Sequence, residues 1–102
     1  MLLSIDHCHR NNILHRDVKL DNFLVEPSEH HDLKVKLADF GIACLFDKES
    51  PPSNQCGSVL TMAPEMLIGK VYCHKVDMWG LGVILYELLS TNIPFYDDDN
   101  EK

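Results

Sequence analysis

The chain has 102 residues and a net charge of −7, so it is long enough for one small domain at most and too acidic to favour a nucleic acid as partner. Its longest apolar stretch, residues 81–85, is far too short to span a bilayer, and we expect no membrane partner. The four cysteines contain no Cys-x-x-Cys pair, which favours reduced thiols and an intracellular, cytoplasmic location.

The first predicted element is a helix at the start of the chain. Leu2, Ile5 and Cys8 recur at helical spacing. Asn11 and Asn12 then end the pattern, because asparagine tolerates the left-handed backbone conformation in which many helices stop.

Two short strands are predicted next. Residues 23–25 form an apolar run, and in residues 33–37 apolar side chains alternate with lysines. Residues 26–32 between them have the composition of a hairpin loop. We therefore expect these two strands to pair as an antiparallel hairpin.

The second half of the chain is predicted to contain a long loop and two helices. Residues 47–56 are rich in Ser, Pro and Asn, and Pro51-Pro52 forbids a helix there. Ala63-Pro64 begins a helical turn, and residues 76–89 form a helix that is apolar around nearly its whole circumference. Such a helix is typical of a protein interior. We find no internal repeat and no interdomain linker.

Four motifs follow one another in a specific order: His-Arg-Asp-Val-Lys-Leu-Asp-Asn at 15–22, Ala-Asp-Phe-Gly at 38–41, Ala-Pro-Glu at 63–65 and Asp-Met-Trp-Gly at 77–80. Each three-residue signal alone occurs by chance in many chains. Together and in this order they resemble the catalytic half of a eukaryotic protein kinase of the Ser/Thr type.

The resemblance covers the whole chain but only the middle part of the family's fold. It implies an α+β fold, namely the mainly helical C-terminal lobe of a protein kinase, incomplete and without the small N-terminal β lobe. Residues 1–102 would then be one partial catalytic domain. It would hold the catalytic loop, the Asp-Phe-Gly motif, the activation segment and the central buried helix, and both ends would be cut from something larger.

The resemblance also implies the site residues. Asp17 would orient a substrate hydroxyl and take its proton, and Lys19 would stabilise charge on the transferred phosphate and contact ATP. Asn22 and Asp39 would hold Mg²⁺ through hard oxygen ligands and so bind the nucleotide, and Leu24 would lie beneath the adenine ring. An isolated Asp or Asn more often caps a turn, so the prediction depends on the four polar residues occurring in this order.

Several further residues are expected to support the site by packing. In the family, the residues at His15 and Phe40 stack on each other, and those at Ile84 and Leu88 support Leu24 from the buried helix. Plain core packing would give the same sequence pattern.

Other positions bear on subclass and substrate. In the resemblance, Asp77 holds the backbone of the catalytic loop, and Ser58 bridges Lys19 and Asp17, which is a mark of Ser/Thr kinases. Thr61 stands where the family commonly has an aromatic residue in the floor of the substrate site. Substrate preference therefore cannot be predicted from this stretch.

Arg16 is the residue that in this family pairs with a phosphate on the activation segment, because a guanidinium suits phosphate geometry. Where many members carry the phosphorylated Thr, this chain has Asn54. We hypothesise that activity depends less on phosphorylation at that point than is common. Ser50 and Ser53 lie close by and are either substitute phosphorylation sites or ordinary loop residues.

Two acidic features complete the expectations. By resemblance, Glu65 forms a buried ion pair with an Arg beyond the end of this chain, and a buried carboxylate without its partner is destabilising. Asp97, Asp98, Asp99 and Glu101 form an acidic tail, which is either a solvated loop or a docking site for basic peptides.

The function that these motifs favour is ATP-dependent transfer of the γ-phosphoryl group to Ser or Thr of a protein, with ATP and Mg²⁺ as cofactors. The partners would be a protein substrate and ATP. The alternative is a truncated, non-catalytic kinase-like protein that acts at most as a binding partner, because these residues contain no Gly-rich phosphate loop and no Val-Ala-Ile-Lys strand. On their own, the 102 residues are expected neither to phosphorylate a protein nor to bind Mg-ATP tightly.

Overall fold

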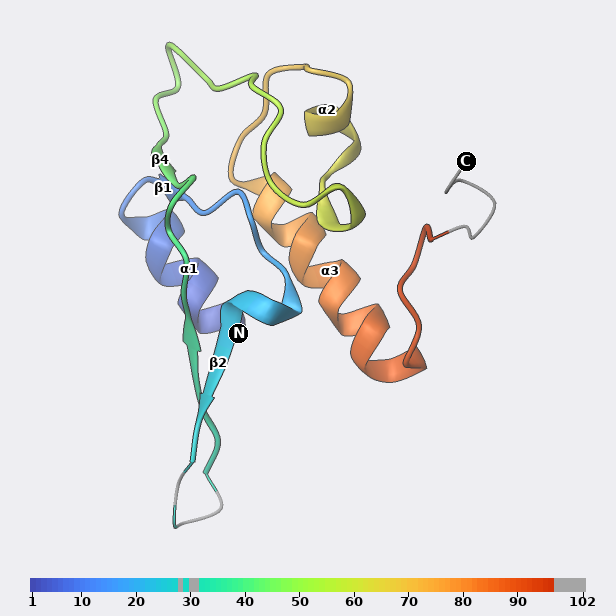
Figure 1. Cartoon of the computed structure of the whole chain (residues 1–102). Coiled ribbons are helices and arrows are strands. Elements are labelled where there is room, and N and C mark those ends of the chain that lie inside the picture. Colours follow the sequence, from blue (N-terminus) through green and yellow to red (C-terminus); the bar gives the residue numbers. More distant parts are fainter. Residues whose placement is uncertain (28, 30–31, 97–102) are drawn as a thin grey trace.

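The computed structural model describes residues 1–27, 29 and 32–96, which form a small α+β unit (Figure 1). Its elements in chain order are α1 (Leu2–Arg10), β1 (Ile13–Leu14), the 3₁₀ turn η1 (Leu20–Asn22), β2 (Phe23–Glu26), β3 (Lys34–Leu37), β4 (Cys44–Leu45), the 3₁₀ turn η2 (Val59–Thr61), α2 (Pro64–Leu67) and α3 (Lys75–Ser90).

Helix α1 ends where the asparagines predict. The backbone N–H groups of Asn11 and Asn12 donate to the carbonyls of Cys8 and His9, both at 3.0 Å. Asn12 adopts a left-handed conformation with φ of 56°, which few residues tolerate as well as asparagine. This turn directs the chain into β1 and then into the 15–22 loop.

Strands β2 and β3 form the predicted antiparallel hairpin, in which Phe23 pairs with Leu37 and Glu26 with Lys34. Only Phe23 at its base is buried, and Leu24 and Val25 are exposed. The hairpin extends away from the helices in Figure 1. Of the loop predicted over residues 26–32, positions 28, 30 and 31 lie outside the described residues.

A second strand pair joins β1 to β4, with Ile13 opposite Leu45 and Leu14 opposite Cys44. The backbone N–H of Phe46 extends the pair by donating to the Asn12 carbonyl at 2.7 Å. The sequence did not predict this pair, because two residues are too few to show a strand period.

Residues 47–56 form no helix or strand, and α2 begins with Pro64 at its first position, both as predicted. Proline suits this place because a helix leaves its first N–H groups without partners. The helix is a single turn, and Met66 anchors it by burying its side chain almost completely.

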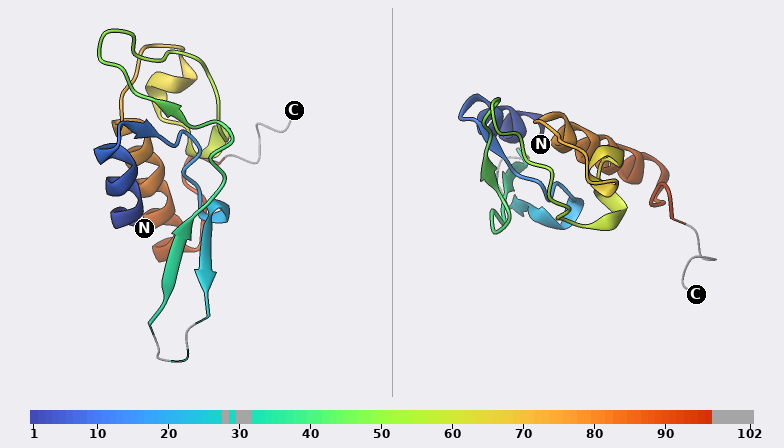
Figure 2. Two further views of the ribbon diagram at one scale, coloured as in Figure 1. Left: turned by 90° about the vertical axis from the view of Figure 1, so that its left-hand side faces the viewer. Right: turned by 90° about the horizontal axis from the view of Figure 1, so that it is seen from above.

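Helix α3 confirms the predicted helix and ends at Thr91, whose φ of 60° is left-handed and whose N–H donates to the Glu87 carbonyl at 2.9 Å. One side of it lies against α1, as the two perpendicular views in Figure 2 show. The expectation of an interior helix holds only for its buried residues, which are Val76, Asp77, Gly80, Val83 and Ile84. The large apolar side chains that α3 leaves exposed are Met78, Trp79, Leu85, Tyr86, Leu88 and Leu89.

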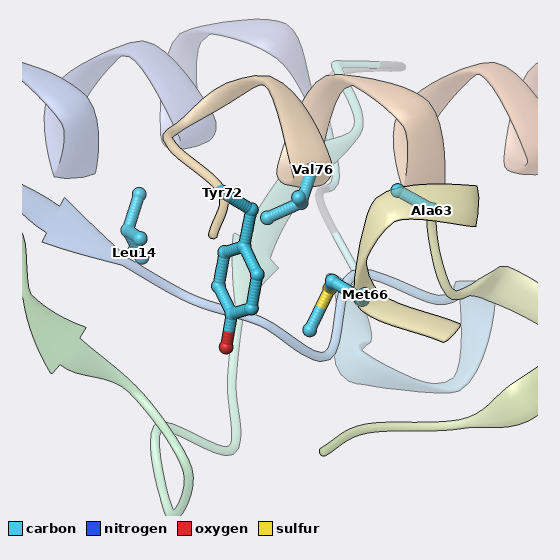
Figure 3. Close-up of a cluster of buried hydrophobic side chains, with 5 residues drawn as sticks. All are labelled: Leu14, Ala63, Met66, Tyr72 and Val76. Atoms are coloured by element: carbon cyan, nitrogen blue, oxygen red, sulfur yellow. The ribbon is translucent and has the colours of Figure 1, made fainter. Parts of the chain in front are cut away.

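Two hydrophobic cores flank the 15–22 loop. The first consists of Leu14, Ala63, Met66, Tyr72 and Val76 (Figure 3). The second consists of Ile5, Val18, Phe23 and Ile84. Because the chain enters the loop from Leu14 in one core and reaches Val18 in the other, residues 15–17 are held at both ends.

Across residues 1–27, 29 and 32–96, no helix is both long and apolar enough to cross a membrane. The acidic tail, which contains Asp97, Asp98, Asp99 and Glu101, lies outside the described residues, so both interpretations of it stay predictions.

Candidate active site

The 15–22 loop is held by a carboxylate of α3. Asp77 is 1% exposed and accepts the backbone N–H groups of His15 and Arg16, both at 2.9 Å. Nε2 of His9 on α1 donates to the same carboxylate at 2.8 Å. Three donors therefore satisfy one buried charge and hold Arg16 in a left-handed conformation with φ of 70°. The implied role of Asp77 agrees with this geometry, but sequence reasoning missed His9.

His15 connects this loop to the Asp-Phe-Gly motif. Its ring is fully buried. Nε2 of the ring lies 2.8 Å from the carbonyl oxygen of Ala38, and Nδ1 lies 3.2 Å from the backbone nitrogen of Asp17. A carbonyl only accepts and an N–H only donates, so the ring is the neutral tautomer with its proton on Nε2. The ring meets that of Phe40 in an edge-to-face arrangement with 4.8 Å between centroids, so the two residues are in contact as predicted, although they are not stacked in parallel.

A hydroxyl bridges the two residues that the resemblance marks as catalytic. Lys19 Nζ donates to Ser58 Oγ at 3.0 Å, and Ser58 Oγ donates to Asp17 Oδ1 at 2.9 Å. The ammonium also lies 3.9 Å from Asp17 Oδ2. Asp17 and Lys19 therefore face the same point, although Ser58 comes from the segment before α2. The bridge that the resemblance implies at Ser58 is present.

Asn22 and Asp39 lie on adjoining backbone segments. The buried Asn22 donates its side-chain N–H to the Asp17 carbonyl at 2.7 Å, and its backbone carbonyl accepts the backbone N–H of Ala38 at 2.8 Å. Asp39, the next residue, is exposed, has φ of 59° and accepts the N–H of Gly41 at 3.3 Å. Amide and carboxylate oxygens are ligands that Mg²⁺ prefers, and phosphates and waters would complete its octahedron. The donor set therefore fits this ion.

The residues expected around the adenine are brought together only in part. Leu24 is 55% exposed, so its side chain is accessible to a ligand. Ile84 is buried in the core beside Phe23, at the base of the hairpin. Leu88 is 54% exposed and lies outside this core.

Arg16 contacts the position that the sequence singled out. Its guanidinium donates to the Ile42 carbonyl at 2.7 Å and to Asn54 Oδ1 at 2.9 Å. Burial lowers the pKa of Arg16, but a hydrogen bond to Tyr72 and the nearby thiols outweigh this effect, and the pKa lies above its ordinary value. Ser50 and Ser53, which the sequence leaves open as substitute phosphorylation sites or ordinary loop residues, are both exposed.

Tyr72 is a further residue of this network that sequence reasoning missed. Its hydroxyl accepts from Arg16 Nη1 at 3.3 Å and donates to the Asn54 carbonyl at 2.9 Å. Burial raises the pKa of this phenol above its ordinary value. The only signal in the sequence is an aromatic residue within the polar connection between α2 and α3.

Glu65 differs from its expectation. Its side chain is only partly buried, and no ion pair to it forms within the part of the chain that the structure describes. Full burial of this carboxylate is therefore not observed, whereas the ion pair that the resemblance implies is not tested by these residues and stays a prediction. A partly hydrated carboxylate costs far less than a fully buried one, because water screens its charge.

A cavity of about 340 Å³ opens beside the Lys19–Ser58 bridge. Val83 of α3 forms part of its wall, and the carboxylates of Asp21 and Glu87 line it from two sides. Thr61, which replaces the aromatic residue usual in the family, also lines it and donates its hydroxyl to the Ser58 carbonyl at 3.2 Å. The cavity is therefore a largely apolar groove next to the candidate catalytic residues, with two carboxylates and the Lys19 ammonium in its lining.

Comparison with known proteins places this geometry in context. All of residues 1–102 match the family model described as "Protein kinase domain". The chain is 41% identical over 100 residues to "Probable serine/threonine-protein kinase KIN1 homolog" of Encephalitozoon cuniculi (strain GB-M1), covering 97% of this chain and 17% of that protein.

Two further relatives are similar at the same level. "Carbon catabolite-derepressing protein kinase" of Secale cereale is 41% identical over 101 residues, which are 98% of this chain and 19% of that protein. "Mitosis inducer protein kinase cdr1" of Schizosaccharomyces pombe is 43% identical over 96 residues, which are 93% of this chain and 16% of that protein. The chain thus spans less than a fifth of the length of these relatives.

Proposed function

The chain belongs to the protein kinase domain family and is homologous to serine/threonine kinases of the SNF1/KIN1 group, and we propose that it forms part of the catalytic centre of such an enzyme. The reaction is transfer of the γ-phosphoryl group of ATP to Ser or Thr of a protein. Residues 1–102 are, in this proposal, a partial catalytic domain from the mainly helical C-terminal lobe. The observation that carries the proposal is the Asp17–Ser58–Lys19 bridge.

In this proposal Asp17 positions the attacking hydroxyl. Its Oδ1 already accepts one hydroxyl, that of Ser58, and its side chain keeps 14% of its surface exposed for a second. The carboxylate orients the substrate oxygen and takes its proton as the new phosphorus–oxygen bond forms. Lys19, held by Ser58 on the same side, stabilises the negative charge that develops on the transferred group.

Asn22 and Asp39 would hold Mg²⁺ in the same proposal, and the ion, when bound, neutralises charge on the ATP phosphates. Their placement supports this role because the Ala38–Asn22 backbone hydrogen bond of 2.8 Å joins the two segments that carry them. Leu24, exposed on β2, would contact the adenine. The groove beside Lys19 would receive the protein substrate.

The test is a transfer assay on the full-length protein with Asp17→Asn and a matched change at Asp32, an exposed carboxylate of the hairpin. Asp17→Asn is expected to lower the transfer rate by about a thousandfold or more, since it removes the base and misplaces the hydroxyl. Asp32→Asn is expected to leave the rate unchanged. A folded wild-type protein that binds Mg-ATP and transfers nothing would refute the proposal in favour of the non-catalytic alternative.

A further inference from the structure

The guanidinium of Arg16 is held by three neutral acceptors. Nε donates to the Ile42 carbonyl at 2.7 Å, and Nη1 donates to Asn54 Oδ1 at 2.9 Å and to the Tyr72 hydroxyl at 3.3 Å. The side chain is half-buried, so these contacts replace much of its water. Within residues 1–27, 29 and 32–96, no carboxylate forms an ion pair with this guanidinium.

Tyr72 makes two hydrogen bonds to the chain segment around Asn54. Its backbone N–H donates to the Pro52 carbonyl at 3.0 Å, and its hydroxyl donates to the Asn54 carbonyl at 2.9 Å. The sulfur of Cys56 lies 3.8 Å from the same hydroxyl. Figure 3 shows the Tyr72 ring packed in the first core, with the hydroxyl pointing away from α3. Residues 52–56, here called the 52–56 segment, therefore lie against a side chain that is itself fixed.

Gln55 adds a contact on the other side of the segment, where its side-chain N–H donates to the Leu67 carbonyl at 2.6 Å. The 52–56 segment thus has contacts to the 15–22 loop through Arg16, to α2 through Leu67, and to the α2–α3 connection through Tyr72. Asn54, which supplies the acceptor for Arg16, cannot be phosphorylated.

We propose that Asn54 and Tyr72 form a phosphate-independent lock that holds Arg16 and the 52–56 segment in place, and that Tyr72 is a positioning residue of the site. The neutral oxygens of Asn54 and Tyr72 fill the place that a phosphate would otherwise take opposite the guanidinium. The lock rests on the proposed function only where it links the 52–56 segment to catalysis. That link is short, because Gly57 alone separates the segment from Ser58 of the Asp17–Lys19 bridge.

The primary experiment is limited proteolysis of the full-length protein with a protease of broad specificity, scored as the cleavage rate within the 52–56 segment by mass spectrometry. Wild type is compared before and after phosphatase treatment. Tyr72→Phe removes only the hydroxyl and keeps the buried ring, with Tyr86→Phe as the matched control because Tyr86 is exposed on α3. Asn54→Ala removes the side-chain oxygen that accepts from Arg16, and Asn54→Asp keeps an oxygen at that position.

Tyr72→Phe and Asn54→Ala are each expected to raise this cleavage rate about tenfold, because each frees part of the segment to open locally. Asn54→Asp, Tyr86→Phe and phosphatase treatment are expected to leave it within about twofold of wild type, since all three keep the lock. The proposal is overturned if phosphatase alone opens the segment, or if Asn54→Ala is cleaved as slowly as Asn54→Asp. Asn54 is exposed, so this pair tests the lock even if Tyr72→Phe disturbs the core.

A transfer assay on the same variants separates the lock from the proposed function. Tyr72→Phe and Asn54→Ala are expected to lower kcat several-fold without changing the KM for ATP, and Asn54→Asp to restore kcat. Proteolysis needs no catalytic activity, so the expected cleavage pattern in a protein that transfers nothing would refute the proposed function and leave the lock intact.

Discussion

The carboxylate of Asp77 on α3 accepts the backbone N–H of His15 at 2.9 Å, although 62 positions separate the two residues. Its other oxygen accepts the N–H of Arg16, so one buried side chain sets two consecutive peptide groups of the 15–22 loop. The position of Asp17, the next residue, therefore depends on a helix near the far end of the chain.

This dependence can be measured by removing the carboxylate. Asp77→Ala is expected to lower the free energy of unfolding by about 3 kcal/mol, because it leaves two backbone N–H groups of the loop without acceptors. Chemical denaturation checks this value, with Asp32→Ala as the surface control, for which a change of less than about 0.5 kcal/mol is expected. Equal effects of the two changes would mean that Asp77 does not support the loop.

The two carboxylates of the proposed centre are expected to differ in what they bind. Asp39→Asn is expected to weaken Mg-ATP binding, because Asp39 is the charged oxygen ligand proposed for the metal. Asp17→Asn is expected to leave ATP affinity nearly unchanged while lowering the rate, because it contacts the hydroxyl. Titration of the two full-length variants with Mg-ATP measures this difference. Equal ATP affinity in both would contradict the separate roles proposed for Asp39 and Asp17.

The hydroxyl of Ser58 offers a smaller and more specific test. Ser58→Ala removes the bridge between Lys19 and Asp17 and is expected to lower the transfer rate about tenfold through misplacement of both groups. Ser58→Thr keeps a hydroxyl and is expected to retain most of the rate. If the two variants were equally impaired, the bridge would not be the relevant property of this position.

Two glycines of α3 make a matched pair. A Cβ on Gly80 would lie 2.6 Å from the carbonyl oxygen of Val18, whereas one on Gly82 would meet nothing within 4 Å. Gly80→Ala is therefore expected to destabilise the protein by about 2 kcal/mol or more, since the loop or the helix must move. Gly82→Ala is expected to stabilise it by about 0.5 to 1 kcal/mol, because alanine is the better helix former. Opposite shifts in melting temperature would confirm the close approach of α3 to the loop.

Stability is also expected to fall in mildly alkaline solution. Burial raises the pKa of the Cys8 thiol above its ordinary 9.0, and the charge of Asp77 adds to the effect. Burial likewise raises the pKa of Cys44, although Arg16 opposes it. The folded protein then keeps protons that the unfolded chain releases, so this stabilisation is complete below about pH 9 and is lost as pH rises through the raised pKa values.

Urea denaturation at pH 8 and about 9.5 checks this sign in wild type and in a Cys8→Ser, Cys44→Ser double variant, since serine does not titrate there. Wild type is expected to lose more stability than the double variant. The same loss in both proteins would assign the pH dependence to other groups.

The elements that could be predicted from the sequence have either a repeating pattern of apolar side chains or a residue, such as Asn or Pro, with a distinct backbone preference. Helix α1 was bounded by Asn12, the hairpin by the alternation around Val35, and α2 by Pro64. The β1–β4 pair was not predicted, because strands of two residues are too short to show an alternation of apolar and polar side chains. The exposed side of α3 could not be predicted, because its apolar pattern is the same whether or not neighbours cover it.

The site was predicted through motif order, and what was missed came from residues distant in sequence. The Ser58 bridge and a contact between His15 and Phe40 follow the resemblance and are present in the structure, the two rings meeting edge to face. His9 and Tyr72 act through contacts across 68 and 56 positions, which no local pattern encodes. The proposed roles of Asp17, Lys19, Asn22, Leu24 and Asp39 stay predictions.

The large sequence separation between Asp77 and His15 affects how the 15–22 loop forms during synthesis on the ribosome. Synthesis proceeds at about 5 to 20 residues per second, so the 15–22 loop exists for about 3 to 12 seconds before its acceptor is even added. During this interval the backbone N–H groups of His15 and Arg16 must be hydrated. Nascent chains that stop before Asp77 is added are thus expected to carry an unformed loop, and pauses in translation between the two motifs would prolong that state.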